Sequence, residues 1–191
     1  MRGCRVICKK GCVGVIRSQM YAFMNPQAKL EELLRACMKA LNQGYTAICV
    51  PQWFVAAAKE ALTDTKMKVA TIAGLPGGTT SSPAKYAEIK QAVANGAEVI
   101  ILPVNMEFCK NGDLAAARND FSSAIIAGRL SGETKTKVIA LIDAAELEVE
   151  ALEKIAGMCM EEKASSVMLM NAAAEKKEQL SAKFLVESYE N

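Results

Sequence analysis

The chain has 191 residues, of which 51% are hydrophobic and 23% charged, and its net charge is only +2. This length suits one domain with a substantial core, and it is short of the roughly 250 residues typical of an eight-strand α/β barrel. The balanced charge excludes the basic surface of a nucleic-acid-binding protein and a polybasic membrane patch. No apolar run approaches the roughly 20 residues of a membrane span, and Lys9, Lys10 and nearby glycines interrupt any signal-peptide core. We therefore expect a soluble cytoplasmic protein with a single domain over residues 1–191.

The cysteines and the missing histidine narrow the possible chemistry. The seven cysteines are Cys4, Cys8, Cys12, Cys37, Cys49, Cys109 and Cys159. An odd number scattered through apolar segments indicates reduced, buried thiols. The first three recur at every fourth residue, but a zinc site needs paired CxxC spacing or histidines, and the chain has no histidine. We expect no metal and no other cofactor, and any catalysis would have to use Lys, Asp, Glu, Tyr or Cys.

The N-terminal part predicts one clear strand between two helices. Residues 4–19 carry β-branched residues interrupted by glycines, a pattern compatible with a strand or hairpin. After Asn25-Pro26, apolar residues from Leu30 to Leu41 recur at helical spacing. Thr46–Val50 predicts a short buried strand, and a helix follows around Val55–Leu62.

The most informative stretch is a strand–helix–strand unit. Val69–Gly74 and Glu98–Val104 are short apolar runs on either side of a helical pattern from Pro83 to Asn95. Their spacing fits a parallel βαβ unit. The loop from Leu75 to Thr80 follows the first strand at its C-terminal end, where α/β folds place ligand-binding groups.

Strands and helices continue to alternate after Asp113. The predicted elements are a helix to about Ile126 or Leu130, a strand at Lys137–Ile142, a helix at Ala144–Glu162, a strand at Ser166–Met170 and a charged final helix at Ala172–Ser188. Five strands, with room for a sixth at the N-terminus, recur with a helix between each pair. This alternation is typical of a parallel α/β fold.

Several of these segments resemble the deoxyribose-phosphate aldolase family. They are TAICV followed by Pro51, then KVATIAGLPGGTT, YAEIKQAVANGAEVI, Asn105 and KNGD, in that order and spacing. The resemblance covers about Asn25 to Met170. It implies an α/β, (β/α)8 TIM-barrel-like fold, incomplete or modified at the N- and C-terminal ends, with a site at the C-terminal ends of the strands. It also implies a class I aldolase that joins acetaldehyde to glyceraldehyde 3-phosphate through a lysine Schiff base. That chemistry needs a lysine of depressed pKa, a second lysine and a proton-relaying carboxylate.

The positions that the resemblance assigns to catalysis carry other residues. The family's Schiff-base lysine lies late in the sixth strand, in a pattern such as VKTS, and Met168 takes its place. Its proton-relaying aspartate precedes by four residues the asparagine that matches Asn105, and that position here is Ile101. A further family aspartate, in the first strand, aligns near Met20. The second lysine and the phosphate-binding glycines belong to the seventh and eighth strands, and the chain ends at Asn191 before either occurs in register.

Six family-like positions define a possible pocket. They are Cys49, Leu75, Gly77, Gly78, Thr79 and Asn105. Cys49 would face the barrel interior, and because no base is available to activate it, core packing is the favoured interpretation. Backbone N–H groups of the glycine-bearing loop offer a place for a phosphate.

A relocated lysine is the alternative source of an imine. Lys137 begins the fifth strand, at the wrong end of a barrel, and Lys110 lies on the correct side but in solvent. Lys9 and Lys10 belong to the unmatched N-terminus.

We therefore expect a deoxyribose-phosphate-aldolase-like protein that has lost its aldol chemistry and is a non-catalytic binding or assembly component. One alternative is an active class I aldolase or lyase with a relocated lysine, acting on a small aldehyde or sugar phosphate. Another is a binder of a small phosphorylated or aldehyde ligand. Without the last two strands, two sheet edges would be open. We expect a homo-oligomer or a protein partner, or closure of the gap by the first segment and the last helix, and neither a nucleic-acid nor a membrane partner.

Overall fold

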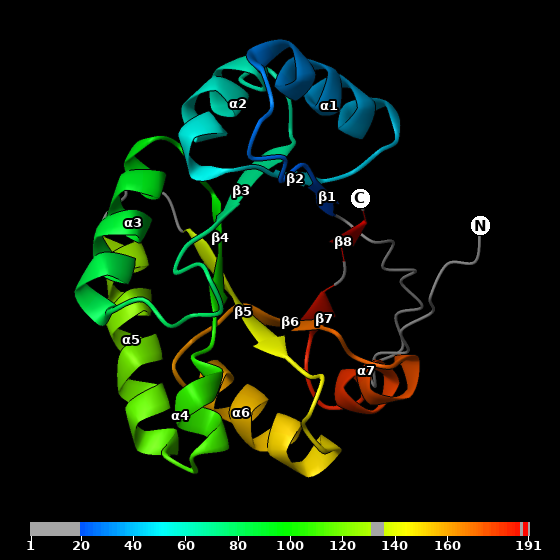
Figure 1. The fold of residues 1–191 in the computed structure, drawn as a ribbon. Coiled ribbons are helices and arrows are strands. Elements are labelled where there is room, and N and C mark those ends of the chain that lie inside the picture. Colours follow the sequence, from blue (N-terminus) through cyan, green and yellow to red (C-terminus); the bar gives the residue numbers. More distant parts are fainter. Residues whose placement is uncertain (1–19, 131–135, 188, 191) are drawn as a thin grey trace.

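The computed structural model describes residues 20–130, 136–187 and 189–190. Strands and helices alternate around a parallel sheet that curls about a central axis, with the helices on its outside (Figure 1). The strand order is β7-β6-β5-β4-β3-β2-β1-β8, and each neighbouring pair is parallel. The structure confirms the expected α/β fold of TIM-barrel type, modified at its ends.

The elements are short. The strands are β1 (Met20–Ala22), β2 (Ala47–Cys49), β3 (Lys68–Ile72), β4 (Val99–Pro103), β5 (Lys137–Asp143), β6 (Ser166–Met170), β7 (Val186–Glu187) and β8 (Tyr189–Glu190). The helices are α1 (Leu30–Asn42), α2 (Val55–Ala61), preceded by the 3-10 turn Gln52–Phe54, α3 (Ser82–Ala94), α4 (Met106–Lys110), α5 (Leu114–Leu130), α6 (Val149–Glu161) and α7 (Ala174–Ser181).

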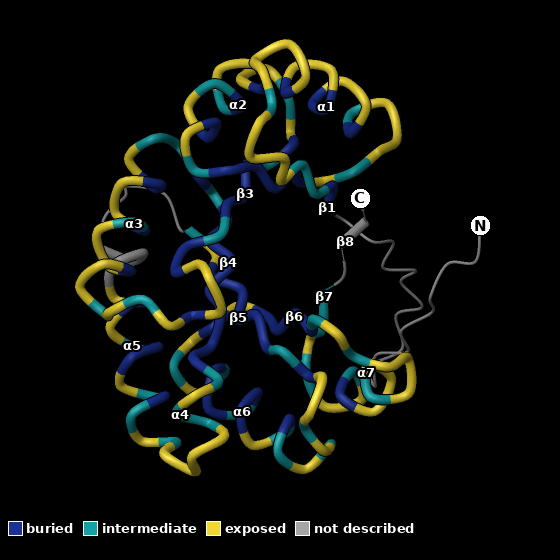
Figure 2. Tube along the Cα trace, viewed as in Figure 1, coloured by how far each residue is buried: buried dark blue, intermediate teal, exposed yellow. Residues whose placement is uncertain are grey.

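Strands β1 to β6 of the curled sheet are mostly buried on both faces (Figure 2). Successive residues of a strand point to opposite faces, so each strand contributes to two apolar layers. On β4, Val99 and Ile101 belong to the layer inside the curl, whereas Ile100 and Leu102 pack in the layer beneath the helices. This double burial explains why the strand sequences are continuously apolar instead of alternating with polar residues.

Side-chain caps account for two differences from the sequence-based prediction. Residues 106–110, for which the sequence patterns predict no element, form α4, because Asn105 Oδ1 accepts a hydrogen bond from the Glu107 backbone N–H at 3.1 Å and caps the helix. Helix α6 begins at Val149 and not at Ala144. The Asp143 carboxylate accepts a hydrogen bond from the Ala145 N–H at 3.1 Å, which stabilises a turn before the helix.

The two ends of the described chain differ more from the prediction. The proposed strand or hairpin at residues 4–19 lies outside the described residues, and the first described strand is β1. The final helix α7 ends at Ser181 and not at Ser188, and the residues after it form β7 and β8. Strand β7 pairs with β6 and β8 pairs with β1, so one C-terminal segment reaches both edges of the sheet. In the described residues, strands β7 and β8, and not the last helix, cover the edges of β6 and β1, whereas the first segment of that prediction lies outside the described residues.

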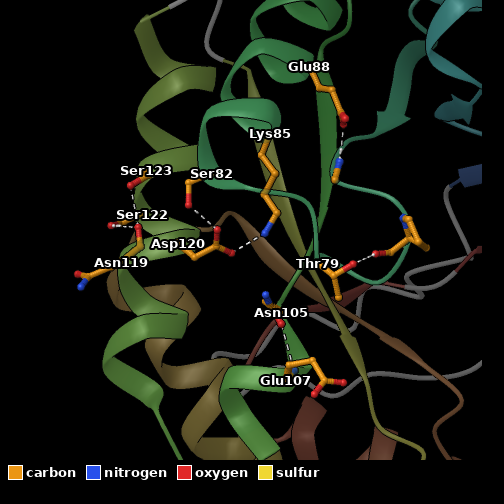
Figure 3. A network of polar contacts seen from close by, with 12 residues as sticks. Thr79, Ser82, Lys85, Glu88, Asn105, Glu107, Asn119, Asp120, Ser122 and Ser123 are labelled. Atoms are coloured by element: carbon orange, nitrogen blue, oxygen red, sulfur yellow. Dashed lines mark hydrogen bonds and ion pairs between the residues drawn. The ribbon is translucent and has the colours of Figure 1, made fainter. Parts of the chain in front are cut away.

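A buried ion pair joins α3 to α5 (Figure 3). Lys85 is fully buried, and its Nζ lies 2.5 Å from Asp120 Oδ2. Ser82 Oγ donates to the other carboxylate oxygen at 2.8 Å. The Lys85 stem passes beside Gly74 at the end of β3, where an added Cβ would lie 3.2 Å from Lys85 Cγ and Cε. The pair therefore connects two outer helices with the strand end that leads into the 75–80 loop.

Removing the cation of this pair should destabilise the fold strongly. Lys85→Ala leaves the Asp120 carboxylate buried without its charge partner, so we expect the free energy of unfolding to fall by roughly 3–5 kcal/mol. Equilibrium urea unfolding followed by circular dichroism measures this loss. The matched control is Arg35→Ala, which breaks the exposed Arg35–Glu31 pair and should have a much smaller effect.

A double variant distinguishes the cost of burying an unpaired charge from the cost of lost side-chain packing. Lys85→Met with Asp120→Leu replaces both charges by apolar groups, and it should recover most of the loss. A Lys85→Ala protein as stable as the wild type would show that the ion pair does not hold these helices together.

Candidate functional site

The inside of the curled sheet is where the sequence analysis placed the site, and it is filled by apolar side chains. The buried cluster there consists of Met20, Ala47, Cys49, Ala70, Val99, Ile101, Ile139, Leu141 and Met168. Each of these nine residues exposes 8% or less of its surface. Ile72 and Met170 pack against the cluster from positions nearer the C-terminal ends of β3 and β6. The cluster therefore has the character of a second hydrophobic core.

Three positions singled out by the resemblance lie together in this cluster. Ile101 is on β4, Met168 on β6 and Met20 on β1, and all three side chains point to the inside of the curl. Leu141 of β5 is the register partner of Met168, and Ile139 is the register partner of Ile101. Neither an alkyl group nor a thioether can form an imine or relay a proton. The structure thus brings together the positions named from the sequence, and it surrounds them with hydrocarbon and sulfur.

One carboxylate reaches the same layer, and the sequence analysis missed it. Val186 of β7 packs on the outer layer, so the next residue, Glu187, faces the inside. Its Oε1 accepts a hydrogen bond from Ser166 Oγ at 2.5 Å, and its register partner is Met168. The charged sequence of residues 172–188 predicts a helix, and that prediction gives no sign of an inward-facing strand residue at position 187. Its carboxylate places one proton-accepting group beside the apolar cluster.

The described lysines near the strands do not combine an inward position at the C-terminal ends with an unpaired amine. Lys68 and Lys137 stand at the N-terminal ends of β3 and β5. Lys85 is buried outside the sheet, and Asp120 pairs with it. Lys110 lies on the C-terminal side, in α4, where its hydrogen bond to Glu146 raises its pKa. An imine-forming lysine needs the opposite shift, because only the neutral amine is nucleophilic.

Cys49 faces the inside of the curl, as expected from the sequence. It is buried, and desolvation raises the pKa of its thiol from 9.0 to about 12. Its Sγ lies 3.8 Å from Met24 Sδ. At neutral pH the thiol is therefore protonated, and its contacts are those of a packing residue.

The loop from Leu75 to Thr80 is held mainly by its own hydrogen bonds. Gly77 and Gly78 have positive φ angles of 58° and 76°. At Gly78 an added Cβ would lie 2.5 Å from the Pro103 carbonyl oxygen, so only glycine lets this loop approach the end of β4. Thr79 Oγ1 donates to the Pro76 carbonyl at 3.0 Å (Figure 3). The peptide bond between Leu75 and Pro76 is cis.

Asn105 lies beside this loop but has a local role. An added Cβ on Gly78 would meet the Asn105 backbone nitrogen at 3.0 Å, which shows how closely the two segments approach. The Asn105 side-chain oxygen is used to cap α4. Of the proposed pocket residues, the structure brings Gly78 and Asn105 together, whereas Cys49 belongs to the inner cluster.

Exposed apolar side chains lie at the C-terminal ends of three neighbouring strands. Met24, Trp53 and Leu75 follow β1, β2 and β3 respectively, and all three are exposed. Because the strands are parallel, their C-terminal ends lie at the same end of the curled sheet. We call these three residues the apolar rim. Of these three residues only Leu75 lies in a sequence motif, and Met24 and Trp53 carry none.

The described residues hold neither a cluster of metal ligands nor a membrane-spanning helix. Within them, no group of three or more Cys, Asp or Glu side chains is arranged to hold a metal ion. No helix in the part of the chain that the structure describes is both long and apolar enough to cross a membrane.

Comparisons with known proteins agree with the resemblance seen in the sequence. A family model described as DeoC/LacD family aldolase matches residues 13–124. A deoxyribose-phosphate aldolase of Streptococcus pneumoniae serotype 19F (strain G54) is 34% identical over 119 residues, which are 62% of this chain and 53% of the relative. The corresponding enzyme of Clostridium kluyveri is 30% identical over the same length. The chain thus spans about half the length of the curated relatives it matches.

Solved structures show the same fold at lower sequence identity. A putative deoxyribose-phosphate aldolase from Coccidioides immitis has a TM-score of 0.78 at 17% identity, covering 88% of this chain and 70% of that protein. A tetrameric deoxyribose phosphate aldolase from Aeropyrum pernix has a TM-score of 0.68 at 14% identity, covering 81% and 63%.

The buried thiol of Cys49 should resist alkylation in the folded protein. At pH 8 a rise in pKa from 9.0 to about 12 lowers the thiolate fraction about a thousandfold. We expect iodoacetamide to modify Cys49 at least about a hundredfold more slowly in native protein than in urea, as measured by peptide mass mapping.

Cys109 provides an internal comparison for this experiment. It is half-buried and burial raises its pKa to about 11, so it should react faster than Cys49. Equal native and unfolded rates at Cys49 would show that the inner cluster is open to solvent and reagent.

Proposed function

Since the chain belongs to the DeoC/LacD aldolase family, we propose that it is a deoxyribose-phosphate-aldolase-like protein without Schiff-base chemistry and serves as a non-catalytic binding or assembly component. The observation that carries this proposal is the shared location of Ile101 and Met168 in the closely packed apolar cluster inside the sheet. A class I aldolase needs a primary amine at its reacting centre.

The environment of these positions supports the same conclusion. A protonated imine intermediate inside a hydrocarbon cluster would lose its hydration, which costs several kcal/mol, and of the charged side chains described above only the Glu187 carboxylate lies beside this cluster. The Glu187 carboxylate alone cannot replace the amine, because it accepts a proton but forms no imine. Lys110, on the C-terminal side, is paired with Glu146 and has a raised pKa.

The apolar rim supports the binding part of the proposal. Met24, Trp53 and Leu75 expose large apolar side chains at the face where this fold places ligand contacts. Exposed apolar groups gathered at one place favour the contact of a ligand or another protein. Because the inner cluster is filled, a small sugar phosphate or aldehyde would have to bind at this rim and the 75–80 loop.

Borohydride trapping tests the loss of imine chemistry. Purified protein is incubated with acetaldehyde, or with deoxyribose 5-phosphate, and sodium borohydride, and its intact mass is measured. We expect no stoichiometric adduct, because Lys85 is paired outside the sheet and Lys68 and Lys137 stand at the N-terminal ends of their strands.

The deoxyribose-phosphate aldolase of Streptococcus pneumoniae is a suitable positive control under the same conditions. A reduced adduct on a single lysine of the present chain would contradict the proposal and favour an active aldolase with a relocated lysine. Peptide mapping of that adduct would then identify the nucleophile.

A further inference from the structure

Two lysines lie on the inner face of the curled sheet, at the end opposite the candidate site. Lys68 begins β3 and Lys137 begins β5. Residues two apart on a strand share a face, and Ala70 and Ile139, each two residues further along, belong to the inner cluster. Both lysines therefore stand on the inner face, where the N-terminal ends of the strands meet solvent. We call this place the N-terminal mouth.

The two lysines are near enough to share a ligand. Strands β3 and β5 lie on either side of β4 (Figure 1), and with about 4.8 Å between neighbouring strands their backbones are roughly 10 Å apart. Ala70 and Lys137 are both register partners of Val99. A stagger of about one residue per strand then brings Lys68 level with Lys137, as for alternate strands of a barrel layer. Their long, flexible stems allow both ammonium groups to contact one anion.

The charges of both lysines are unmatched in the part of the chain that the structure describes. Within it, neither side chain has a hydrogen bond or an ion pair. Glu98 precedes β4, the strand between them, but its carboxylate is bound by Lys59 of α2 at 2.9 Å. Neighbouring cations repel one another, and an anion placed between Lys68 and Lys137 would turn this repulsion into attraction.

One carboxylate lies deeper on the same inner face. Ser166 begins β6 and is the register partner of Ile139, two residues after Lys137. Its hydroxyl donates to Glu187 Oε1 at 2.5 Å, and Glu187 is the register partner of Met168. The negative charge of Glu187 repels an anion that approaches the inner cluster. An anion attracted by the lysines would therefore stay at the mouth.

We propose that Lys68 and Lys137 form a binding site for a small dianion, namely inorganic phosphate or a phosphate monoester, at the N-terminal mouth. Lysine binds phosphate as a compact point charge, and two such charges match a doubly charged group with several acceptor oxygens. The site lies at the opposite end of the sheet from the apolar rim and the 75–80 loop. It is therefore separate from the site of the proposed function.

Isothermal titration calorimetry of the full chain with inorganic phosphate, at constant ionic strength, tests this site. The wild type should bind one phosphate per chain, and the double variant K68Q/K137Q should raise the dissociation constant at least about tenfold. The matched control is K90Q/K177Q, which removes two exposed helix lysines and the same charge, and it should stay within about twofold of the wild type. Circular dichroism and thermal melting establish that the variants fold.

Methyl phosphate in place of inorganic phosphate distinguishes the two sources of the dianion. Tighter binding of the ester identifies a monoester as the ligand, and tighter binding of inorganic phosphate identifies the free ion.

A third variant tests the position of the anion. Glu187→Gln keeps an oxygen that accepts the Ser166 hydroxyl and removes the negative charge below the mouth. Because this repulsion is lost, the dissociation constant for phosphate should fall about two- to fivefold.

Three results would overturn the inference: a wild type that binds no phosphate at millimolar concentration, equal affinity of K68Q/K137Q and K90Q/K177Q, or unchanged affinity of Glu187→Gln. Borohydride trapping reports on imine formation and not on phosphate binding. Its outcome therefore separates a failure of this inference from a failure of the proposed loss of catalysis.

Discussion

The burial of every central strand on both faces is the constraint on which this structure depends. A parallel sheet that curls must fill its inside as well as the layer beneath its helices. Here the inside is filled by small and medium apolar side chains such as Ala70, Val99 and Ile101. In a catalytic barrel some of those positions must instead carry charge and admit water. The same positions therefore determine both whether the fold is stable and whether it can catalyse.

A buried ion pair lies outside that inner layer, between two of the helices. Lys85 and Asp120 compensate one another between α3 and α5, and the nearby Glu88 carboxylate accepts a hydrogen bond from the Gly74 N–H at 2.6 Å. These contacts fix the end of β3 and the start of the 75–80 loop. The C-terminal face consequently presents a firmly supported loop and an apolar rim above an apolar interior.

Local sequence patterns predicted much of the fold but not its long-range pairings. The predicted strand Ser166–Met170 has the same bounds as β6, because an apolar run there is bounded by clear turn residues. The segment after Ser181 was taken for helix, because its strand character comes from pairing with β6 and β1, which are distant in the sequence. For the site, the family resemblance located Ile101, Met168 and Cys49. It missed Lys85, although Lys85 and Ile89 share a helix face at a spacing of four, because a lysine on a buried face is uncommon.

The central claim is that the inside of the sheet is a packed core and not a hydrated active site. The most direct test is the equilibrium unfolding of Ile101→Asp, which introduces the carboxylate that the family resemblance places there, beside Ile101→Val as a control for lost volume. A packed core predicts that Ile101→Asp lowers the free energy of unfolding by at least about 3 kcal/mol, and Ile101→Val by about 0.5–1.5 kcal/mol. An Ile101→Asp protein as stable as the valine variant would show that this position tolerates a hydrated charge, and would contradict the account.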